Sequence, residues 1–208
     1  MKQSWKPGTM IYPLPAVLVS CGNTPERRNL ITVAWTGTIC TNPAMCYISI
    51  RPERHSYGII KEEMEFTINL TTEAMAHATD WCGVRSGKDF DKWKETGLTP
   101  MPGVKVGCPY IEEAPLSIEC RVKEIVKLGS HDMFIADIVG VNVDESLLDE
   151  KGKLHLSKAG LCAYAHGEYF ALGKQIGDFG FSVRRKSVQK RRNMQAKKEG
   201  RKNGKNGK

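Results

Sequence analysis

LITVAWTGTICTNPAMCYISIRPERHSY, residues 30–57, carries the clearest strand pattern of the chain. Apolar residues alternate with polar or small ones from Ile31 to Thr36 and again from Tyr47 to Arg51, which is the two-residue period of pleated strands. Asn42-Pro43 lies between the two runs and is typical of a turn. The segment therefore predicts two strands joined by a polar turn.

An arginine-rich stretch follows the second of these strands. Pro52 cannot donate to a strand ladder, so it places Arg51 at a strand end. A helix is predicted to begin near Ser56, a candidate N-cap for residues 57–63. A helix start favours an anion, and Arg51 and Arg54 add charge-assisted hydrogen bonds. From the residue types alone, an anion clamp and an ordinary capped helix with surface ion pairs are equally good interpretations.

Further elements are expected along the rest of the chain. Strands are predicted where β-branched and aromatic residues gather: Ala16 to Ser20, Glu65 to Leu70, Leu116 to Val126 and Met133 to Val143. The predicted helices are Tyr57 to Glu63, Thr72 to Val84 and Phe90 to Glu95. Strands dominate, which indicates a mainly β domain with short helices as crossovers.

Length and hydropathy bound the class of protein. The 208 residues fit one ordinary domain and a tail. No stretch approaches the roughly 18 to 20 apolar residues that span a bilayer, and the N-terminus lacks the apolar core of a signal peptide. We expect a cytoplasmic protein without a membrane partner.

The seven cysteines include no C-x-x-C pair. This argues against a disulfide framework and against common zinc or iron–sulfur spacings, so no metal site is predicted. Most of the cysteines are expected to be buried. Cys40 and Cys82 stand apart because both lie in or beside the motifs described below.

The formal charge of +8 is concentrated at the C-terminus. Residues 184–208 hold twelve Lys or Arg and one Glu, whereas residues 1–183 hold 19 basic and 22 acidic residues, a net charge of −3. Such a basic tail cannot bury enough apolar surface to fold alone. It could hold nucleic acid, an acidic partner or nothing specific. Solubility or non-specific RNA contact is the favoured interpretation, because the tail lacks the interleaved aromatic residues that stack on bases.

Nucleotide and hydrolase fingerprints are missing from the sequence. It contains neither G-x-G-x-x-G nor a P-loop, and neither H-E-x-x-H nor G-x-S-x-G. The five histidines show no metal-ligand spacing. Other motifs are present in order along the chain: Thr32 to Gly37, Asn42-Pro43, Ile48 to Tyr57, Phe66 to Leu70, Asp80 to Asp89, Leu128 to Asp132, Tyr164 to Tyr169 and Gly177 to Ser182.

Together these motifs resemble the flavin reductase-like family, and more narrowly its flavoredoxin branch. The resemblance implies a mainly β, six-stranded antiparallel Greek-key split barrel with a few short crossover helices. It implies a domain over residues 1–183 that binds FMN non-covalently and pairs as a homodimer, followed by the basic tail of residues 184–208.

The resemblance also implies the cofactor-binding residues. The isoalloxazine ring would be lined by Thr32, Val33, Ala34, Trp35, Thr36 and Thr38. The phosphate and ribityl chain would meet Ser49, Ile50, Arg51, Arg54, His55 and Ser56, with a second phosphate-side loop of Ser86, Gly87 and Lys88. Trp35 fits an ordinary core position equally well. Ala44, His55 and Lys88 depart from the family pattern, and lysine lacks the planar fork of the usual arginine.

Three functions follow from these observations. The first is flavoredoxin-like electron transfer, in which bound FMN exchanges electrons with a redox protein. The second is an NAD(P)H-dependent FMN reductase that supplies reduced flavin, with NADH or NADPH as donor. The third is a nucleic-acid-associated protein that uses the tail. Oxidoreductase chemistry is expected, and no residue is assigned a catalytic role because the flavin carries that chemistry.

Overall fold

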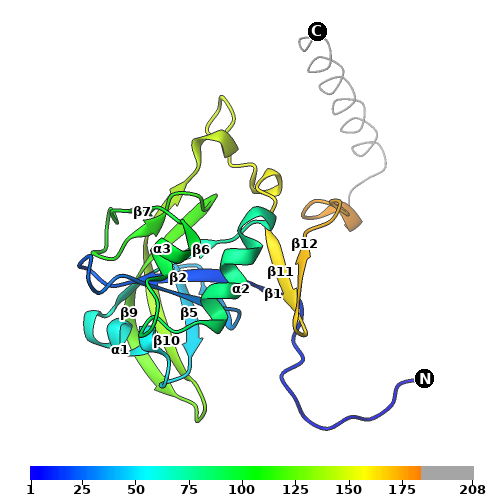
Figure 1. Ribbon diagram of the computed structural model, residues 1–208. Helices are drawn as coiled ribbons and strands as arrows, with labels where there is room; N and C mark the ends of the chain where they lie inside the picture. The colour runs from blue at the N-terminus through cyan, green and yellow to red at the C-terminus, as the bar shows by residue number, and fades with distance from the viewer. Residues whose placement is uncertain (184–208) are drawn as a thin grey trace. The chain divides into compact units, whose positions relative to one another are not determined.

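A computed structural model describes residues 1–183, and its main element is a curled antiparallel sheet (Figure 1). Seven strands pair in the order β3-β2-β6-β9-β10-β5-β4. They are β2 (Val17–Cys21), β3 (Asn29–Val33), β4 (Thr36–Cys40), β5 (Met45–Ile50), β6 (Glu65–Leu70), β9 (Leu116–Lys127) and β10 (Asp132–Val143). The predicted mainly β antiparallel class is confirmed, with seven strands in this sheet where six were expected.

Shorter elements surround this sheet. Two small sheets contain β1 (Leu14–Pro15), β11 (Cys162–Ala165) and β12 (Glu168–Ala171), and β7 (Pro100–Met101) and β8 (Tyr110–Ile111). The α-helices are α1 (His55–Glu63), α2 (Ala76–Val84) and α3 (Lys92–Thr96). Single 3₁₀ turns are η1 (Glu73–Met75), η2 (Glu145–Leu147), η3 (Leu156–Lys158) and η4 (Phe181–Val183).

The strand predicted through Thr36 in fact ends at Val33. The chain bends there and resumes as β4, which forms a hairpin with β5 around the Asn42-Pro43 turn. Two contacts with β5 fix the bend: the Ser49 N–H donates to the Trp35 carbonyl at 2.8 Å, and the Thr36 hydroxyl donates to the Tyr47 carbonyl at 2.6 Å. Alternation alone missed β4 because a tertiary contact, not a local turn signal, breaks the run.

Helix α1 begins two residues before the predicted Tyr57, and its cap differs. Arg54 is the N-cap and makes no side-chain capping bond. The predicted cap Ser56 is instead 1% exposed, and its hydroxyl oxygen accepts from Asn29 Nδ2 at 2.8 Å. The N-cap prediction was therefore wrong, because the serine is used for a contact with β3.

The second and third predicted helices are confirmed with shifted boundaries. The span from Thr72 to Val84 divides into η1 and α2. Helix α3 starts at Lys92 because Asp91 caps it, accepting from the Lys94 N–H at 3.2 Å.

Strands β2 and β3 are buried on both faces, so the fold has two hydrophobic cores. Alternate residues of β2 and β3 face the inside of the curled sheet, where they meet Ile60 of α1, Phe66 and Phe134. Leu18 and Leu30 face the other way and pack with residues of α2 and α3, including Cys82 and Trp93. Figure 1 shows α2 alongside β2, on the side away from α1. This double burial holds β3 rigidly between the two layers.

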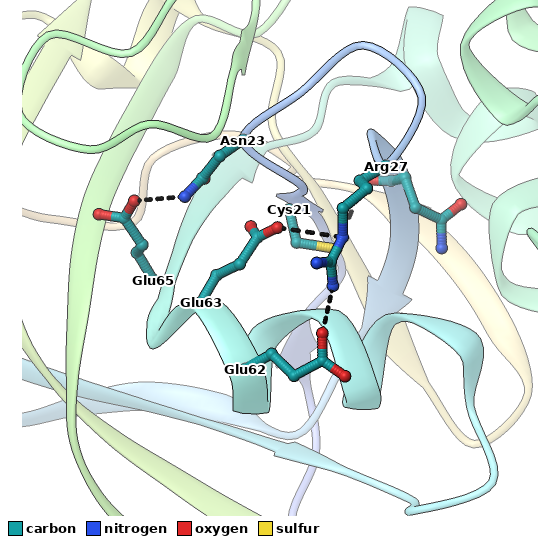
Figure 2. A network of polar contacts seen from close by, with 7 residues as sticks. Cys21, Asn23, Arg27, Glu62, Glu63 and Glu65 are labelled. Atoms are coloured by element: carbon teal, nitrogen blue, oxygen red, sulfur yellow. Dashed lines mark hydrogen bonds and ion pairs between the residues drawn. The ribbon is translucent and has the colours of Figure 1, made fainter.

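The C-terminal end of α1 is acidic and is held by the β2–β3 turn (Figure 2). Arg27 contacts Glu62 at 2.5 Å and Glu63 at 3.3 Å. Asn23 donates to Glu65 at 3.0 Å. Gly22 has φ +93°, and a Cβ there would lie 2.2 Å from the Arg27 carbonyl oxygen, so this tight turn requires glycine.

Two compact units are distinguished in the chain, Met1–Leu172 and Gly173–Lys208. Within the second unit, the described part ends in η4, where the Phe181 N–H donates to the Asp178 carbonyl at 2.9 Å. The predicted basic tail of residues 184–208, and with it any nucleic-acid contact, lies outside the described residues.

The cysteines of the chain are mostly buried, as the sequence predicts. Within residues 1–183, six cysteines are buried and Cys40 is half-buried, as predicted. None of the helices described in that range is long and apolar enough to cross a bilayer.

Candidate functional site

A cavity of about 370 Å³ lies beside the bend after β3. Residues 32–35 and residues 49–51 line it, together with residues of α2 and of the β11–β12 hairpin. Cross-strand pairing places Tyr164 opposite Tyr169, with ring centroids 5.4 Å apart. Burial raises the pKa of Tyr169 to about 12, with a further contribution from its hydrogen bond to Asp80. This cavity is aromatic and suits a planar ring.

Trp35 and His131 form the rim of the same cavity. Their ring centroids lie 4.2 Å apart with the planes tilted by 47°. Trp35 is 37% exposed, so the interpretation of it as an ordinary core tryptophan was wrong. It stands beside the cavity because the chain bends immediately before it.

A second cavity of about 320 Å³ adjoins the first at the start of α1, since both are lined by Ile31, Arg51, Arg54 and Gly83. Arg85 and Lys92 add two more cations to its wall. Among the described residues, Glu53 is the single carboxylate that lines it, and Glu53 already pairs with Arg51 at 3.1 Å. The surplus of positive charge suits an anion.

Lys92 is the least accessible of these cations. It is 4% exposed, and its ammonium donates to the carbonyls of Leu30 at 2.8 Å and Cys82 at 2.7 Å. An ammonium carries three N–H donors, so these two bonds leave one for a further acceptor in the cavity. Burial lowers the pKa of Lys92, and the nearby Arg54 lowers it further. An anion in the cavity would oppose both effects.

Two histidines report the same positive environment. Burial lowers the pKa of His55, with contributions from Lys88 and Lys92. Burial also lowers the pKa of His131, with Arg51 the largest charge contribution. Both cavities are therefore bordered by imidazoles whose neutral form is favoured at neutral pH.

Most predicted site residues gather at these two cavities. The first is lined by Thr32, Val33, Ala34, Trp35, Ser49, Ile50, Arg51 and Arg54, and the second by Arg51, Arg54, His55, Ser56, Ser86 and Gly87. Three predicted residues line neither cavity. Thr36 is buried with its hydroxyl bonded to Tyr47, while Thr38 and Lys88 are exposed.

Several lining residues were missed from the sequence. Asn29, Arg85 and Lys92 line the second cavity, and Asp80 and His131 line the first. His131, Asp80 and Arg85 lie inside motifs already singled out, so the motifs were a usable signal for them. Asn29 and Lys92 carried none, because both reach the cavity through packing between distant segments.

The two singled-out cysteines differ in position and burial. Cys82 lines the second cavity, but burial raises its pKa to about 11, which keeps the thiol protonated at neutral pH. Cys40 is half-buried and lines neither cavity. Within residues 1–183, no group of three or more His, Cys, Asp or Glu could hold a metal ion.

Comparison with known proteins identifies the family of the chain. The family model described as "Flavin reductase like domain" matches residues 9–173. The structure of flavoredoxin from Desulfovibrio vulgaris (Miyazaki F) is similar with a TM-score of 0.81 and 33% identity, covering 88% of this chain and 100% of that one.

Two more distant proteins extend the comparison. A putative flavin reductase with a split barrel domain from Shewanella frigidimarina has a TM-score of 0.72 at 23% identity, covering 81% of this chain and 88% of that one. An NADPH-flavin oxidoreductase of Streptomyces viridifaciens is 26% identical over 134 residues, which is 60% of this chain and 65% of that protein. The chain therefore belongs to the flavin reductase-like domain family, and its curled antiparallel sheet is a split barrel.

Proposed function

We propose that the protein is an FMN-binding flavoprotein of electron transfer, in which FMN stays bound and exchanges electrons with a redox protein. The family supports a flavin-related function. The flavoredoxin of D. vulgaris supports the electron-transfer role, because its whole length is covered by this chain. We also propose that it acts in the cytoplasm and that it forms a homodimer. Light scattering would test the oligomeric state.

The observation that carries this proposal is the positive, uncompensated start of α1. Arg51, Arg54, Arg85 and Lys92 line the second cavity against one carboxylate among the described residues. A helix start is already favourable for an anion. An aromatic cavity adjoins this cationic one, so the pair suits a molecule with a planar ring at one end and a phosphate at the other.

The side chains present fit FMN. Arg51, Arg54 and Ser56 would hold the phosphate, with Ser86 and Gly87 beside it, and Ser49 and Ile50 would lie along the ribityl chain. Residues 32–35 would line the isoalloxazine, with Trp35 at its edge. Thr36, Thr38 and Lys88 do not line the cavities, so in this arrangement they would not touch the flavin. FMN supplies the electron-accepting and electron-donating chemistry when bound.

An NAD(P)H-dependent flavin reductase is the second candidate. The NADPH-flavin oxidoreductase of S. viridifaciens favours it, and the nicotinamide ring would have to lie against the flavin in the cavity that Tyr164 and Tyr169 line. In this role the flavin is exchanged, and NADH or NADPH is the donor. The nucleic-acid role of the tail remains a prediction from charge alone.

The absorption spectrum of the purified protein tests the proposal. We expect a yellow protein with an FMN-like spectrum, or one that acquires it when FMN is added. A colourless protein that takes up no FMN would contradict both flavin functions.

Stopped-flow bleaching separates the two candidates. Rapid bleaching by a reduced ferredoxin-like donor, with flavin retained on dilution, is expected for electron transfer. Rapid bleaching by NADH or NADPH with loss of flavin on dilution would establish the reductase instead. Deletion of residues 184–208 is expected to leave the flavin content unchanged.

A further inference from the structure

The innermost wall of the second cavity carries a polar pair that is almost inaccessible to water. Asn29, at the start of β3, is 4% exposed, and Ser56, in the first turn of α1, is 1% exposed. Both line the cavity, and Asn29 Nδ2 lies 2.8 Å from the Ser56 hydroxyl oxygen. By comparison, the exposed fraction of the Arg51 side chain is 48%.

The direction of this hydrogen bond determines whether Ser56 acts as a donor or an acceptor toward the cavity. An amide nitrogen only donates, so the serine oxygen must accept from Asn29. The hydroxyl proton of Ser56 is then directed elsewhere. A serine held in this way presents a donor, which is the polarity that a phosphate oxygen requires and that a cation would not tolerate.

The alternative acceptor for the Ser56 proton is weak. The nearest thiol is that of Cys21, which donates to the Asn29 carbonyl at 3.8 Å, and burial raises its pKa to about 12 although the Ser56 hydroxyl lowers it. The sulfur is therefore that of a neutral thiol, a poor acceptor. An ionised phosphate oxygen accepts far more strongly, so the hydroxyl would turn to an anion when one is present.

Asn29 is itself held in place from the opposite side. A Cβ on Gly87 would lie 2.3 Å from Asn29 Oδ1, so the loop of residues 86–87 packs directly on this amide. Backbone pairing with Cys21 fixes the other end of the residue. The asparagine thus connects β3, the start of α1 and the loop before α3, and it has little freedom to turn away.

We infer that Asn29 is a positioning residue that orients the Ser56 hydroxyl as a proton donor, and that this pair makes the cavity select a phosphorylated flavin over an unphosphorylated one. The inference rests on the proposed flavin-binding function. It assigns discrimination to two buried neutral groups, whereas the exposed arginines contribute long-range attraction.

A double-mutant cycle on the full-length chain tests this inference. Asn29→Ala, Ser56→Ala and the double variant are titrated with FMN and with riboflavin, and quenching of flavin fluorescence gives the dissociation constants. Ser56→Ala is expected to weaken FMN about 10- to 100-fold and Asn29→Ala about tenfold. Riboflavin affinity should change less than about twofold, because it has no phosphate to meet the serine.

The diagnostic result is non-additivity. If Asn29 acts through Ser56, the double variant binds FMN no more weakly than Ser56→Ala alone. Additive losses, or equal weakening of FMN and riboflavin by Asn29→Ala, would overturn the inference. Asn23→Ala, a change at the opposite end of α1, serves as the matched control and should leave both affinities unchanged.

A second variant covers the case in which Asn29→Ala does not fold. Asn29→Asp keeps the shape but, when ionised, only accepts, so it would draw the Ser56 proton away from the cavity. We expect a larger loss of FMN than for Asn29→Ala with riboflavin unchanged, and unchanged FMN affinity would contradict the inference.

Inorganic phosphate separates failure of the inference from failure of the flavin function. If the wild type takes up neither flavin, the proposed function fails. The preference between the two flavins then fails with it, and the positioning of the Ser56 hydroxyl by Asn29 stands only if phosphate raises the melting temperature of the wild type and not of Ser56→Ala or Asn29→Asp. An absence of any phosphate effect would overturn it.

Discussion

Both ends of α1 carry charges of the sign that the helix dipole disfavours, but other residues of the chain neutralise these charges at one end only. The start of the helix, which favours negative charge, is surrounded by Arg51, Arg54 and Lys92. The last turn, which favours positive charge, carries Glu62 and Glu63 beside a single Lys61. At the acidic end Arg27 contacts both glutamates, as Figure 2 shows, whereas at the basic end a single glutamate is available among the described residues.

This difference indicates which end is a binding site. Local rules of helix design are commonly broken at functional sites, and a break that the chain itself compensates needs no ligand. The acidic end is compensated, so it has a structural role. The basic end is not, so its missing anion is expected to come from outside the chain.

The largest expected effect comes from the buried charge at the basic end. Lys92→Met removes the ammonium and leaves the Leu30 and Cys82 carbonyls without their donor. We expect FMN affinity to fall about 100-fold and the free energy of unfolding to fall by about 1 to 3 kcal/mol. Flavin titration and urea unfolding measure the two.

Lys88→Met is the matched control for this variant. Lys88 is exposed and lines neither cavity, so FMN affinity should change less than about threefold. Equal losses in the two lysine variants would show that the cavity does not define the phosphate contacts.

Replacing the N-cap of α1 is expected to separate stability from binding. Arg54→Asp supplies the capping acceptor that Arg54 does not provide. We expect the flavin-free protein to gain about 1 kcal/mol in free energy of unfolding and FMN affinity to fall at least about tenfold. A variant that loses stability in urea unfolding would contradict the view that the arginine is retained for binding.

Substitutions in the exposed ion pair between Arg51 and Glu53 should change FMN affinity less, and in opposite directions for the two residues. Arg51→Ala removes an accessible cation, and FMN affinity should fall about threefold with a weaker dependence on salt. Glu53→Gln removes the carboxylate that competes for Arg51, so FMN affinity should rise slightly. Titrations at two salt concentrations check both, and changes of the same sign would argue against the pairing.

Removal of Arg27 at the acidic end of α1 should change the stability of the fold and not FMN affinity, and the change in stability should depend on pH. Burial raises the pKa of Glu63 above its ordinary value of 4.5, and Arg27 opposes this. The folded state therefore holds the Glu63 proton more tightly than the unfolded state does. As the pH rises above 4.5 and through the raised pKa, Glu63 ionises and the stability of the fold decreases. Arg27→Met removes the opposing charge, so its loss of stability should be greater at pH 8 than at pH 5.

Thermal unfolding at the two pH values measures this effect. FMN affinity should be unchanged in Arg27→Met, and Lys123→Met, a change at an exposed position of β9, should show no such pH dependence. A loss of stability that is the same at both pH values would remove Glu63 from the explanation.

Predictions from periodicity succeeded where burial is regular and failed where a tertiary contact intervenes. The alternation in residues 47–51 identified β5, and Pro52 marked its end correctly. The same reasoning carried the previous strand through Thr36, although the chain bends after Val33 to contact β5. Ser56 is of a residue type that commonly caps helices, but its hydroxyl oxygen accepts a hydrogen bond from Asn29 instead.

The sequence by itself determined the mainly β class, the family motifs and the arginines at the start of α1, because these depend on local period and on residues close together in the chain. Only the tertiary structure decided which polar groups reach the cavity. Asn29 and Lys92 are 27 and 36 residues from Ser56 in the sequence. They line the same cavity as Ser56 because β3 packs on the sheet interior and α1 on one side and on α2 and α3 on the other. Such contacts between distant segments leave no local pattern to read.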